Sequence, residues 1–528
     1  MLFNSYIFIF LFFPLCLLGF YGLKQKNATW AKIWLTGFSL WFYGYFNIRY
    51  LCIMIFSIVL NYAAYRLMTR AEAVTDAASS KSGRVSFFNK KSILITGVSA
   101  NLLLLFYFKY FDFFIENINA VFGSSMALRN IVLPLGISFF TFQQISFLAD
   151  TYRGELRECG FVDYALFVSF FPQLIAGPIV THDEMLPQFK EIGTKRFDDD
   201  NFCRGLFIFV LGMGKKVLIA DTFGIAVDTG YGMLGELGSI DAVLIMLFYT
   251  LQLYFDFSGY CDMAIGIGKM MGIDITINFN SSYKACNIID FWKRWHITLS
   301  RFFTKNIYIP LGGNRNGNAR MYANLFLVFF LSGLWHGAGW NYILWGVMHG
   351  VLYCVTRWVQ RNCVKNKNME MAGTEGNADF VQKENRSLLI KAGRTVIHVC
   401  KVLVTFLYVN AAWVFFRSES IGQAFELFER MFAGGIAIPS VTVAEAFNLD
   451  EFWYVLKVLH LTDFTYSKYI LMVAFTIVIL LVTFLGKNVQ EMAKKWKMSW
   501  ISAITIAIIF VWCVVSLSGV STFLYFNF

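Results

Sequence analysis

The stretch that decides the fold runs from Asn278 to Gly350 and contains FWKRWHITLS (291–300), YIPLGGNRNGN (308–318) and FLSGLWHGAGW (330–340). Two of its three histidines have unlike settings: His296 lies in a basic segment typical of a membrane surface, and His336 lies where almost nothing nearby is charged. An imidazole in an apolar, tryptophan-containing segment must find hydrogen-bond partners or line a wet cavity, because an unsatisfied polar group in hydrocarbon costs several kcal/mol. We therefore expect His336 to be the chemical centre.

Composition indicates a membrane protein. Hydrophobic residues make up 57% of the 528 residues, whereas soluble proteins are roughly 45–50% apolar even with glycine counted. The formal net charge is +11, but Lys and Arg recur between apolar runs, which is typical of cytoplasmic loops that meet anionic lipids. Nucleic acid is therefore not expected as a partner, and membrane lipids are. The ten cysteines occur singly, which favours neither a disulfide framework nor a zinc site.

The pattern of apolar runs predicts an all-α polytopic membrane protein with a single domain over residues 1–528. We count about 11–12 membrane helices of spanning or half-spanning length. The first, over residues 3–22, lacks a signal-peptide cleavage site and is expected to be retained. Positive charges place the loop at 66–91 in the cytoplasm. We expect a flexible polar loop at 360–393 and an extracytoplasmic excursion with short interfacial helices at 426–466.

The middle of the chain breaks this alternation. FFPQLIAGPIV (170–180) is interrupted by proline and glycine, and LGMGKKVLIADT (211–222) places two lysines inside an apolar run. Broken segments at membrane depth are tolerated only where they are buried in protein or line a wet cavity. We therefore expect re-entrant or half-spanning helices around a central funnel.

His336 has the surroundings of a general base. Gly333 and Gly337 bracket it and would let another helix approach closely, while Trp335 and Trp340 would wall the ring. Burial keeps an imidazole neutral, the form that a base needs. A structural histidine bonded to a neighbouring helix remains an equal alternative.

The basic residues Lys293, Arg294, Arg301 and Arg315 form a cluster near His296 that could hold the phosphates of a nucleotide-bearing donor, with Lys293, Arg294 and Arg315 as the candidate contacts. Contact with lipid headgroups is the alternative, because GGNRNGN matches no P-loop.

Asp256 and Asp262 lie at membrane depth as candidate polar groups of the funnel, or as paired structural carboxylates. Gly268 and Gly272 would form a face for close helix packing. No histidine pair has metal-binding spacing, so neither a metal nor a bound cofactor is expected.

Six ordered motifs resemble those of the membrane-bound O-acyltransferases, in particular the bacterial alginate O-acetyltransferase branch. The motifs are LPLGISFFTFQ (133–143), FPQLIAGPI (171–179), QLYFDFSGYCDMAIG (252–266), FWKRWHITLS (291–300), YIPLGGNR (308–315) and GLWHGAGWNYILWG (333–346). One departure is visible at Phe302 to Asn306, where alginate enzymes typically have Trp-Leu-Arg-Asp-Tyr. This departure leaves the polymer substrate open.

The resemblance implies a membrane enzyme in which His336 acts on the acceptor hydroxyl and His296 is the second signature histidine. It implies an acetyl-CoA donor in the cytoplasm, a polysaccharide acceptor and an extracytoplasmic, SGNH-hydrolase-like acetyltransferase partner. It places the chain in the bacterial inner or plasma membrane as a multi-pass protein. Tyr525, in the closing FLYFNF (523–528), would relay the acyl group outward, although an interfacial aromatic anchor is the more common role of such a residue.

We thus expect an O-acetyltransferase that modifies an extracytoplasmic polysaccharide, directly or through its partner. D-alanyl transfer to teichoic acid and peptidoglycan acetylation are close alternatives. A transporter or export channel is the competing class, against which the lack of a visible inverted repeat counts. A scaffold that only anchors an extracytoplasmic transferase is a third possibility.

Overall fold

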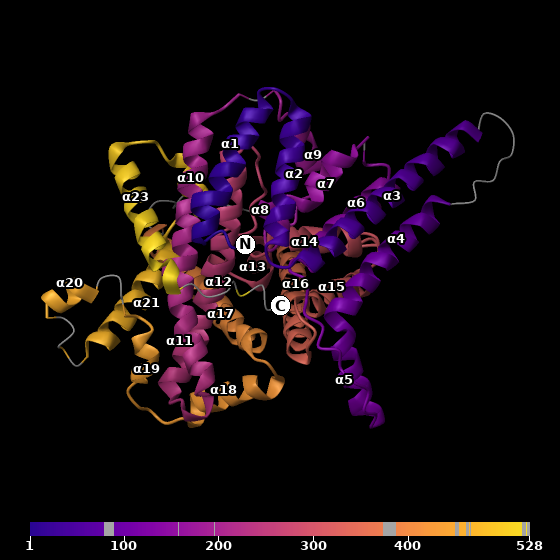
Figure 1. The fold of residues 1–528 in the computed structure, drawn as a ribbon. Helices are drawn as coiled ribbons and strands as arrows, with labels where there is room; N and C mark the ends of the chain where they lie inside the picture. The colour runs from indigo at the N-terminus through magenta and orange to yellow at the C-terminus, as the bar shows by residue number, and fades with distance from the viewer. Residues whose placement is uncertain are drawn as a thin grey trace. The chain divides into compact units, whose positions relative to one another are not determined.

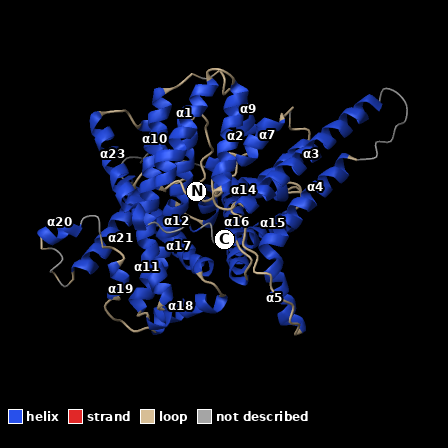
Figure 2. Cartoon of the chain, viewed as in Figure 1, coloured by secondary structure: helices blue, strands red, loops and turns tan. Residues whose placement is uncertain are grey.

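The structure, a computed structural model, describes residues 1–78, 89–156, 158–194, 196–372, 387–448, 453–460, 464, 466–519 and 524. The described residues form helices and loops and contain no strand (Figure 2). This confirms the all-α class. The chain divides into two compact units: 1–222, 252–277 and 489–528 form the first, and 223–251 and 278–488 form the second. The helices α11 (Asp221–Gly232) and α12 (Ser239–Met270) contribute residues to both.

The first unit holds both ends of the chain. Besides its parts of α11 and α12, its helices are η1 (Phe8–Phe12), α1 (Phe13–Lys24), α2 (Ala28–Gly44), α3 (Ile48–Ala78), α4 (Lys90–Leu105), η2 (Phe106–Tyr110), α5 (Phe111–Phe122), α6 (Ile137–Tyr152), α7 (Phe161–Ser169), α8 (Phe171–Leu174), α9 (His182–Lys190), α10 (Asp199–Gly214), η3 (Lys215–Ala220), α22 (Val489–Lys495), α23 (Trp500–Val515) and η9 (Ser516–Gly519). In Figure 1, α3 and α4 lie side by side.

The second unit carries both signature histidines. Besides its parts of α11 and α12, its helices are η4 (Leu234–Glu236), η5 (Ser282–Lys284), α13 (Ile288–Arg294), α14 (Ile297–Phe303), η6 (Thr304–Tyr308), α15 (Asn318–His336), α16 (Trp340–Ala372), α17 (Ser387–Arg417), α18 (Ile421–Ala433), α19 (Val441–Glu445), α20 (Trp453–Val458) and α21 (Ser467–Leu485). The helices α15 and α16 form a hairpin, and α13 and α17 both pack on α16 (Figure 1).

Glycine pairs bring the helices of each unit into close contact. In the second unit, Gly333 of α15 faces Gly346 of α16, and a Cβ on Gly333 would lie 3.0 Å from the Gly346 Cα. In the first unit, a Cβ on Gly212 of α10 would lie 2.8 Å from the carbonyl oxygen of Gly259 in α12. The expected packing face at Gly268 and Gly272 is wrong in part, because Gly272 sits in a turn with positive φ and has nothing near its Cβ position.

The broken segment predicted after residue 170 is present. The helix α7 ends before Phe170, α8 is a single turn, and residues 175–181 are not helical. This irregular backbone is buried, as Ile175, Ala176 and Val180 are almost fully covered, which is how non-helical backbone is tolerated in membrane proteins. The run with Lys215 and Lys216 is different: α10, η3 and α11 follow each other without interruption, with η3 as a π-helical segment.

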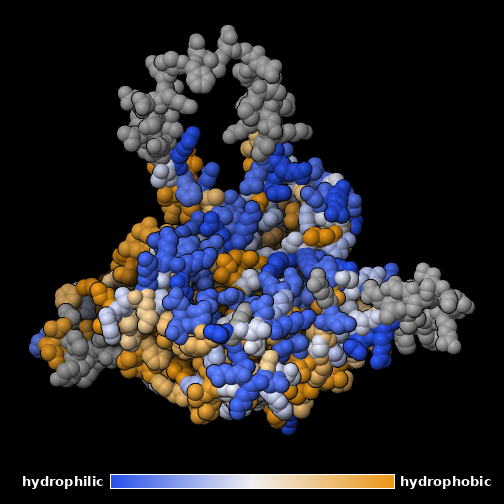
Figure 3. Space-filling model, turned by 90° about the horizontal axis from the view of Figure 1, so that it is seen from above, coloured by the Kyte–Doolittle hydropathy of each residue, from blue (hydrophilic) through white to orange (hydrophobic). Residues whose placement is uncertain are grey.

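Five helices in the described residues are long and apolar enough to cross a membrane: Ile48–Ala71, Lys90–Phe122, Ser239–Met270, Gly393–Arg417 and Ser467–Leu485. Phe8–Lys24 and Trp500–Val515 are shorter apolar helices. The other predicted membrane segments are short or fail this criterion. On the face seen in Figure 3, hydrophobic and hydrophilic residues gather in separate areas. The expected polar loop at 360–393 is helical at both ends, where α16 extends to Ala372 and α17 begins at Ser387.

Candidate active site

His296 is held in a turn between two short helices. It is the N-cap of α14, directly after α13, and its φ of 45° is in the left-handed region. Backbone hydrogen bonds from Asn280 N to Arg294 O (2.9 Å) and from Ile297 N to Asn278 O (3.0 Å) tie the turn to the segment before α13. The side chain is fully buried. The expectation of a histidine at a membrane surface is therefore wrong for the ring, although the neighbouring cations are more exposed.

Asn278 fixes the tautomer of His296. Its Oδ1 accepts from the Thr298 backbone N (3.1 Å) and from Thr298 Oγ1 (2.9 Å), and it lies 3.3 Å from His296 Nδ1. Because an amide oxygen only accepts, Nδ1 must carry the proton and Nε2 must present a lone pair. His296 lies outside the five long apolar helices, and burial lowers its pKa to about 3. The ring is therefore neutral at pH 7 and presents the lone pair of Nε2, while the lowered pKa makes it a weak base.

His336 meets His296 at the end of α15. The two ring centroids are 6.3 Å apart, and His336 also contacts Trp345 (5.1 Å) and Phe416 (5.2 Å). The Trp335 ring contacts both histidines. Its centroid lies 6.0 Å from that of the His296 ring and 4.9 Å from that of the His336 ring. Two histidines 40 residues apart in the sequence thus form one buried site.

The aromatic wall differs from the prediction at one position. Trp340 is 57% exposed, so it does not enclose His336. Trp345, one turn and a half further along α16, takes that place. The close helix approach expected at Gly333 is present, whereas Gly337 lies beyond the end of α15 and faces the ring of Tyr342.

A third histidine lies next to this site. His349 on α16 is fully buried, and its ring is 4.9 Å from that of Trp345. Trp292 Nε1 donates to His349 Nδ1 over 3.4 Å, which leaves the proton of the neutral ring on Nε2. His349 therefore orients Trp292 and belongs to the wall of the site.

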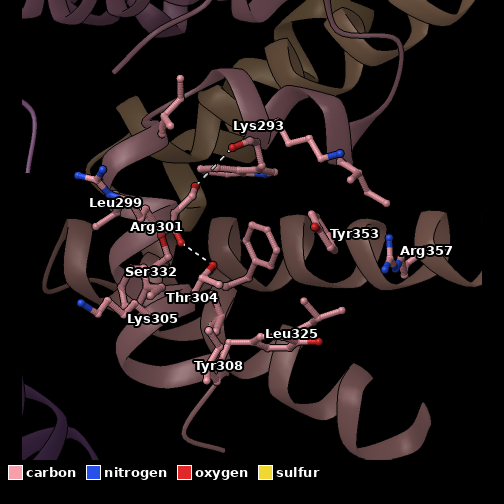
Figure 4. Close-up of a pocket in the computed structure, with 18 residues that line it drawn as sticks. Lys293, Leu299, Arg301, Thr304, Lys305, Tyr308, Leu325, Ser332, Tyr353 and Arg357 are labelled. Carbon is pink, nitrogen blue, oxygen red and sulfur yellow. Dashed lines mark hydrogen bonds between the residues drawn. The ribbon is translucent and has the colours of Figure 1, made fainter. Parts of the chain in front are cut away.

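A cavity of about 660 Å³ opens beside the histidines. Ile297, next to His296, and Ser332, one helical turn before His336, are among its lining residues. Four cationic side chains line it as well: Lys293, Arg301, Lys305 and Arg357. In Figure 4, Lys305 and Arg357 lie at opposite ends of the cavity, and Thr304, Tyr308 and Tyr353 lie between them. The arrangement suits an elongated ligand that carries negative charge.

The structure separates the basic residues that the sequence put together. Lys293 lines the cavity. Arg294 instead pairs with Asp290 on its own helix, Nε to Oδ1 at 2.9 Å, and Arg315 is exposed outside the cavity lining. The prediction missed Lys305 and Arg357. The spacing of Tyr353 and Arg357 places both on one face of α16, but the sequence alone does not tell which helix that face meets.

Asp256 and Asp262 belong to the first unit and the histidines to the second. Each aspartate is paired with a lysine: Asp256 Oδ1 lies 2.7 Å from Lys216 Nζ, and Asp262 Oδ2 lies 2.7 Å from Lys215 Nζ. The structure thus agrees with the paired-carboxylate alternative. Tyr525 lies outside the described residues. No cluster of three or more His, Cys, Asp or Glu side chains suited to a metal occurs in the part of the chain that is described.

Residues 135–382, which include both histidines and the whole cavity, match the membrane-bound O-acyltransferase family. A peptidoglycan O-acetyltransferase of Helicobacter pylori is 38% identical over 100% of this chain and 98% of its own length. The chain belongs to the membrane-bound O-acyltransferase family. It is therefore an O-acyltransferase of the membrane, as its motifs predicted.

Further members of the family are similar over shorter stretches. A probable alginate O-acetylase AlgI of Pseudomonas aeruginosa is 36% identical over 82% of this chain and 75% of its own length. A teichoic acid D-alanyltransferase of Bacillus subtilis is 31% identical over 42% of this chain and 59% of its own length. The names of these relatives thus differ in the acyl group and in the polymer that they mention.

Proposed function

We propose that this O-acyltransferase moves acetyl groups from cytoplasmic acetyl-CoA to hydroxyls of an extracytoplasmic polysaccharide, in the inner membrane of a bacterium. The observation that carries the proposal is the pair of buried histidines, 6.3 Å apart, beside a cavity with four cationic side chains. The histidines supply a base, and the cavity supplies a place for a charged donor. Neither a scaffold nor a transporter needs this combination.

The donor site is the cavity between α13, η6 and α16. Coenzyme A carries phosphates at one end and a thioester at the other, with an uncharged arm between them. Lys293, Arg301, Lys305 and Arg357 are the cations available to its phosphates, and charge-assisted bonds to phosphate are among the strongest hydrogen bonds. Ile297 and Ser332 line this cavity and lie close in the sequence to His296 and His336, neither of which is a lining residue itself. In this assignment Lys293 keeps the role expected from the sequence, and Lys305 and Arg357 replace Arg294 and Arg315.

The reaction is a general-base acyl transfer. The neutral imidazole of His336 takes the proton of the acceptor hydroxyl, and the oxygen attacks the thioester carbonyl. The new carbon–oxygen bond forms as the carbon–sulfur bond breaks, and the proton passes from His336 to the departing thiolate. His296, neutral and fixed by Asn278, holds the donor or acceptor in place. A base of this kind contributes roughly 10²- to 10⁴-fold in rate.

The acceptor is a cell-surface polymer. Peptidoglycan is the first to test, because the relative that names it matches 98% of its own length. Alginate-like exopolysaccharide is the second, and D-alanyl transfer to teichoic acid is the third. Transfer is direct or passes through an extracytoplasmic, SGNH-hydrolase-like partner, with Tyr525 as the candidate relay residue on this chain.

Labelled acetyl-CoA tests the proposal. Membrane vesicles with the wild-type protein are expected to place label on one glycan, which glycosidase digestion then identifies. Vesicles with His336→Ala are expected to place none. Equal label in the glycan of the wild-type and His336→Ala vesicles would contradict the proposal. If label reached a glycan only when labelled D-alanyl donors replaced acetyl-CoA, D-alanyl transfer to teichoic acid would be the function instead.

A further inference from the structure

Two residues with side chains adopt a left-handed backbone conformation in the turns that carry His296. Ser281 has a φ of 47°, and His296 itself has a φ of 45°. This region of φ costs free energy for a residue that has a Cβ, so it persists only where the surrounding contacts impose it. The contacts that impose it on these two residues therefore also determine where the His296 ring lies.

The carbonyl of Arg294 connects the two strained residues. It accepts from the backbone N of Asn280 over 2.9 Å and from Ser282 Oγ over 2.7 Å. Asn280 and Ser282 are the chain neighbours of Ser281, and Arg294 lies two residues before His296. A shift of the backbone at Ser281 is therefore transmitted through this carbonyl to the turn of His296.

The end of the helix α21 holds the same segment by two further hydrogen bonds. Lys284 Nζ donates to the Gly486 carbonyl. Asn488 Nδ2 donates to Asn280 Oδ1 over 2.8 Å. Gly486 is the C-cap of α21, and a lysine near a helix C-terminus also interacts favourably with the helix dipole. The two bonds reach the chain on either side of Ser281, and they join it to a helix long and apolar enough to cross a membrane.

Aromatic packing supports this junction without replacing the two bonds. The Tyr283 hydroxyl donates to the Thr250 carbonyl of α12 over 2.8 Å, and the Tyr283 ring lies 5.3 Å from that of Phe406 on α17. The Phe406 ring lies 5.1 Å from that of Phe484, near the end of α21. Contacts between apolar rings are not directional, whereas hydrogen bonds are. The rings thus hold the segment near α21, and the polar bonds of α21 hold its backbone direction at Ser281.

We propose that Lys284 and Asn488 are positioning residues, which clamp the strained turn at Ser281 to the end of α21 and so hold His296 in place for acyl transfer. Both residues lie outside the lining of the donor cavity, so their effect on transfer passes through the turn. Loss of either bond lets Ser281 relax toward negative φ. The role in transfer rests on the proposed function; the clamp itself does not.

Hydrogen exchange of the full-length protein tests the clamp itself. In Lys284→Met, we expect the peptides that contain Asn280 and Ile297 to exchange about tenfold faster than in the wild type, because a bond from a charged group is lost. Lys468→Met is the matched control, since it removes a lysine from the other end of α21, where Lys468 pairs with Glu445. Its exchange in these peptides is expected to stay within about twofold of wild type, because such exposed pairs contribute little. Equal acceleration in both variants would overturn the proposal.

The kinetics of acetyl transfer test the positioning role. Lys284→Met and Asn488→Ala are each expected to lower kcat, by up to about tenfold for the charged bond. The KM for acetyl-CoA is expected to stay within about twofold of wild type, because these bonds contribute to the turn and not to binding of the donor. Faster exchange with an unchanged kcat would show that the clamp does not position His296. A rise in KM with kcat unchanged would contradict the proposal as well.

The substitution Ser281→Gly tests whether the clamp opposes backbone strain. Glycine adopts positive φ without the cost that a Cβ imposes, so less force is needed to hold the turn. Added to Lys284→Met, it is expected to recover part of the lost kcat. A double variant no faster than Lys284→Met would contradict the role of strain. If the wild type transfers no acetyl, the proposed function fails, and the exchange experiment still decides whether Lys284 holds the turn.

Discussion

His336 is the residue on which the proposed chemistry depends. It is nearly fully buried, and the rings of Trp335, Trp345 and Phe416 pack around it. We expect these three rings to maintain the local structure when alanine replaces the histidine. His336→Ala is expected to lower acetyl transfer by roughly 10²- to 10⁴-fold through the loss of the general base. Radiolabelled transfer in membrane vesicles measures this, and the yield of protein in the membrane is the control. Transfer within threefold of wild type would remove His336 from the mechanism.

Asn278 is expected to act through His296. Its Oδ1 sets the tautomer of the ring, and a hydrogen bond of this kind is worth about 0.5–1.5 kcal/mol. Asn278→Ala is therefore expected to lower the transfer rate by up to about tenfold at saturating donor. Thr298→Val is the matched control, because it removes one other donor to the same oxygen and leaves the contact with His296. A loss in the valine variant as large as in the alanine variant would contradict the assignment.

The cations of the cavity are expected to set the affinity for the donor. Arg357→Ala and Lys305→Ala each remove a charge from the cavity lining, whereas Arg315→Ala removes one from the exposed turn. We expect the KM for acetyl-CoA to rise about tenfold in the first two, because bonds to charged groups contribute about 1.5–3 kcal/mol. The kcat is expected to change little. A similar KM for all three variants would place the donor elsewhere.

The sequence could identify the two histidines but not their distance. His336 stands out because an imidazole is costly in an apolar segment, and His296 because its motif matches the family. What brings them together is the turn that Asn278 closes and the hairpin that Gly333 and Gly346 allow. These are contacts between residues far apart in the sequence. For the same reason the sequence assigned Trp340 to the wall in place of Trp345, and did not show that Arg357 lines the cavity whereas Arg315 does not.

At the scale of the element, the α15–α16 hairpin determines where His336 lies. A methyl group on Gly333 would meet the Tyr342 carbonyl and the backbone of Gly346, neither of which is the end of a flexible side chain. Gly333→Ala is therefore expected to push the helices apart, lowering the thermal unfolding temperature and acetyl transfer together. Gly393→Ala is the control in the same unit, since its Cβ would meet nothing within 4 Å.

The control is expected to shift stability in the opposite direction. An alanine in place of glycine inside a helix stabilises it by up to about 1 kcal/mol where there is space. Thermal unfolding in detergent, followed by the fluorescence of tryptophan, compares the two variants. A Gly333→Ala protein as stable as the wild type would mean that the hairpin can separate without cost.

Elements with strong apolar periodicity could be predicted from the sequence, and irregular ones could not. The apolar runs over roughly 468–486 and 499–518 predict two membrane helices, and α21 and α23 lie there within a few residues. The break near Pro172 was visible because proline and glycine interrupt a helix. By contrast, α10, η3 and α11 continue through Lys215 and Lys216, because Asp262 and Asp256 on a distant segment neutralise these lysines. The division into two units has no signal in the sequence that we recognise.

At the scale of the whole molecule, the proposed reaction has a direction across the membrane. In the proposed reaction the donor is cytoplasmic and the acceptor is outside, so acetyl would cross about 30 Å of hydrocarbon. Sealed inside-out vesicles expose the cytoplasmic face to the medium and keep the outer face in the lumen. With acetyl-CoA in the medium and acceptor glycan in the lumen, we expect labelled glycan. With acetyl-CoA enclosed in the lumen and acceptor glycan in the medium, we expect no labelled glycan.

Salt provides a second test with the same vesicles, because its concentration can be raised on one side of the membrane at a time. Salt shortens the range of exposed charge interactions, to about 10 Å at 0.1 M and 3 Å at 1 M. Raising the salt in the medium is therefore expected to weaken donor use through the four cations of the cavity, and raising it only in the lumen is expected to have little effect. Arg357→Ala is expected to lose part of the response to external salt.

The placement of the two substrates decides the direction of transfer. Labelling that is equal for both placements would mean that the enzyme accepts donor and acceptor from the same side, and the proposed path across the membrane would be wrong.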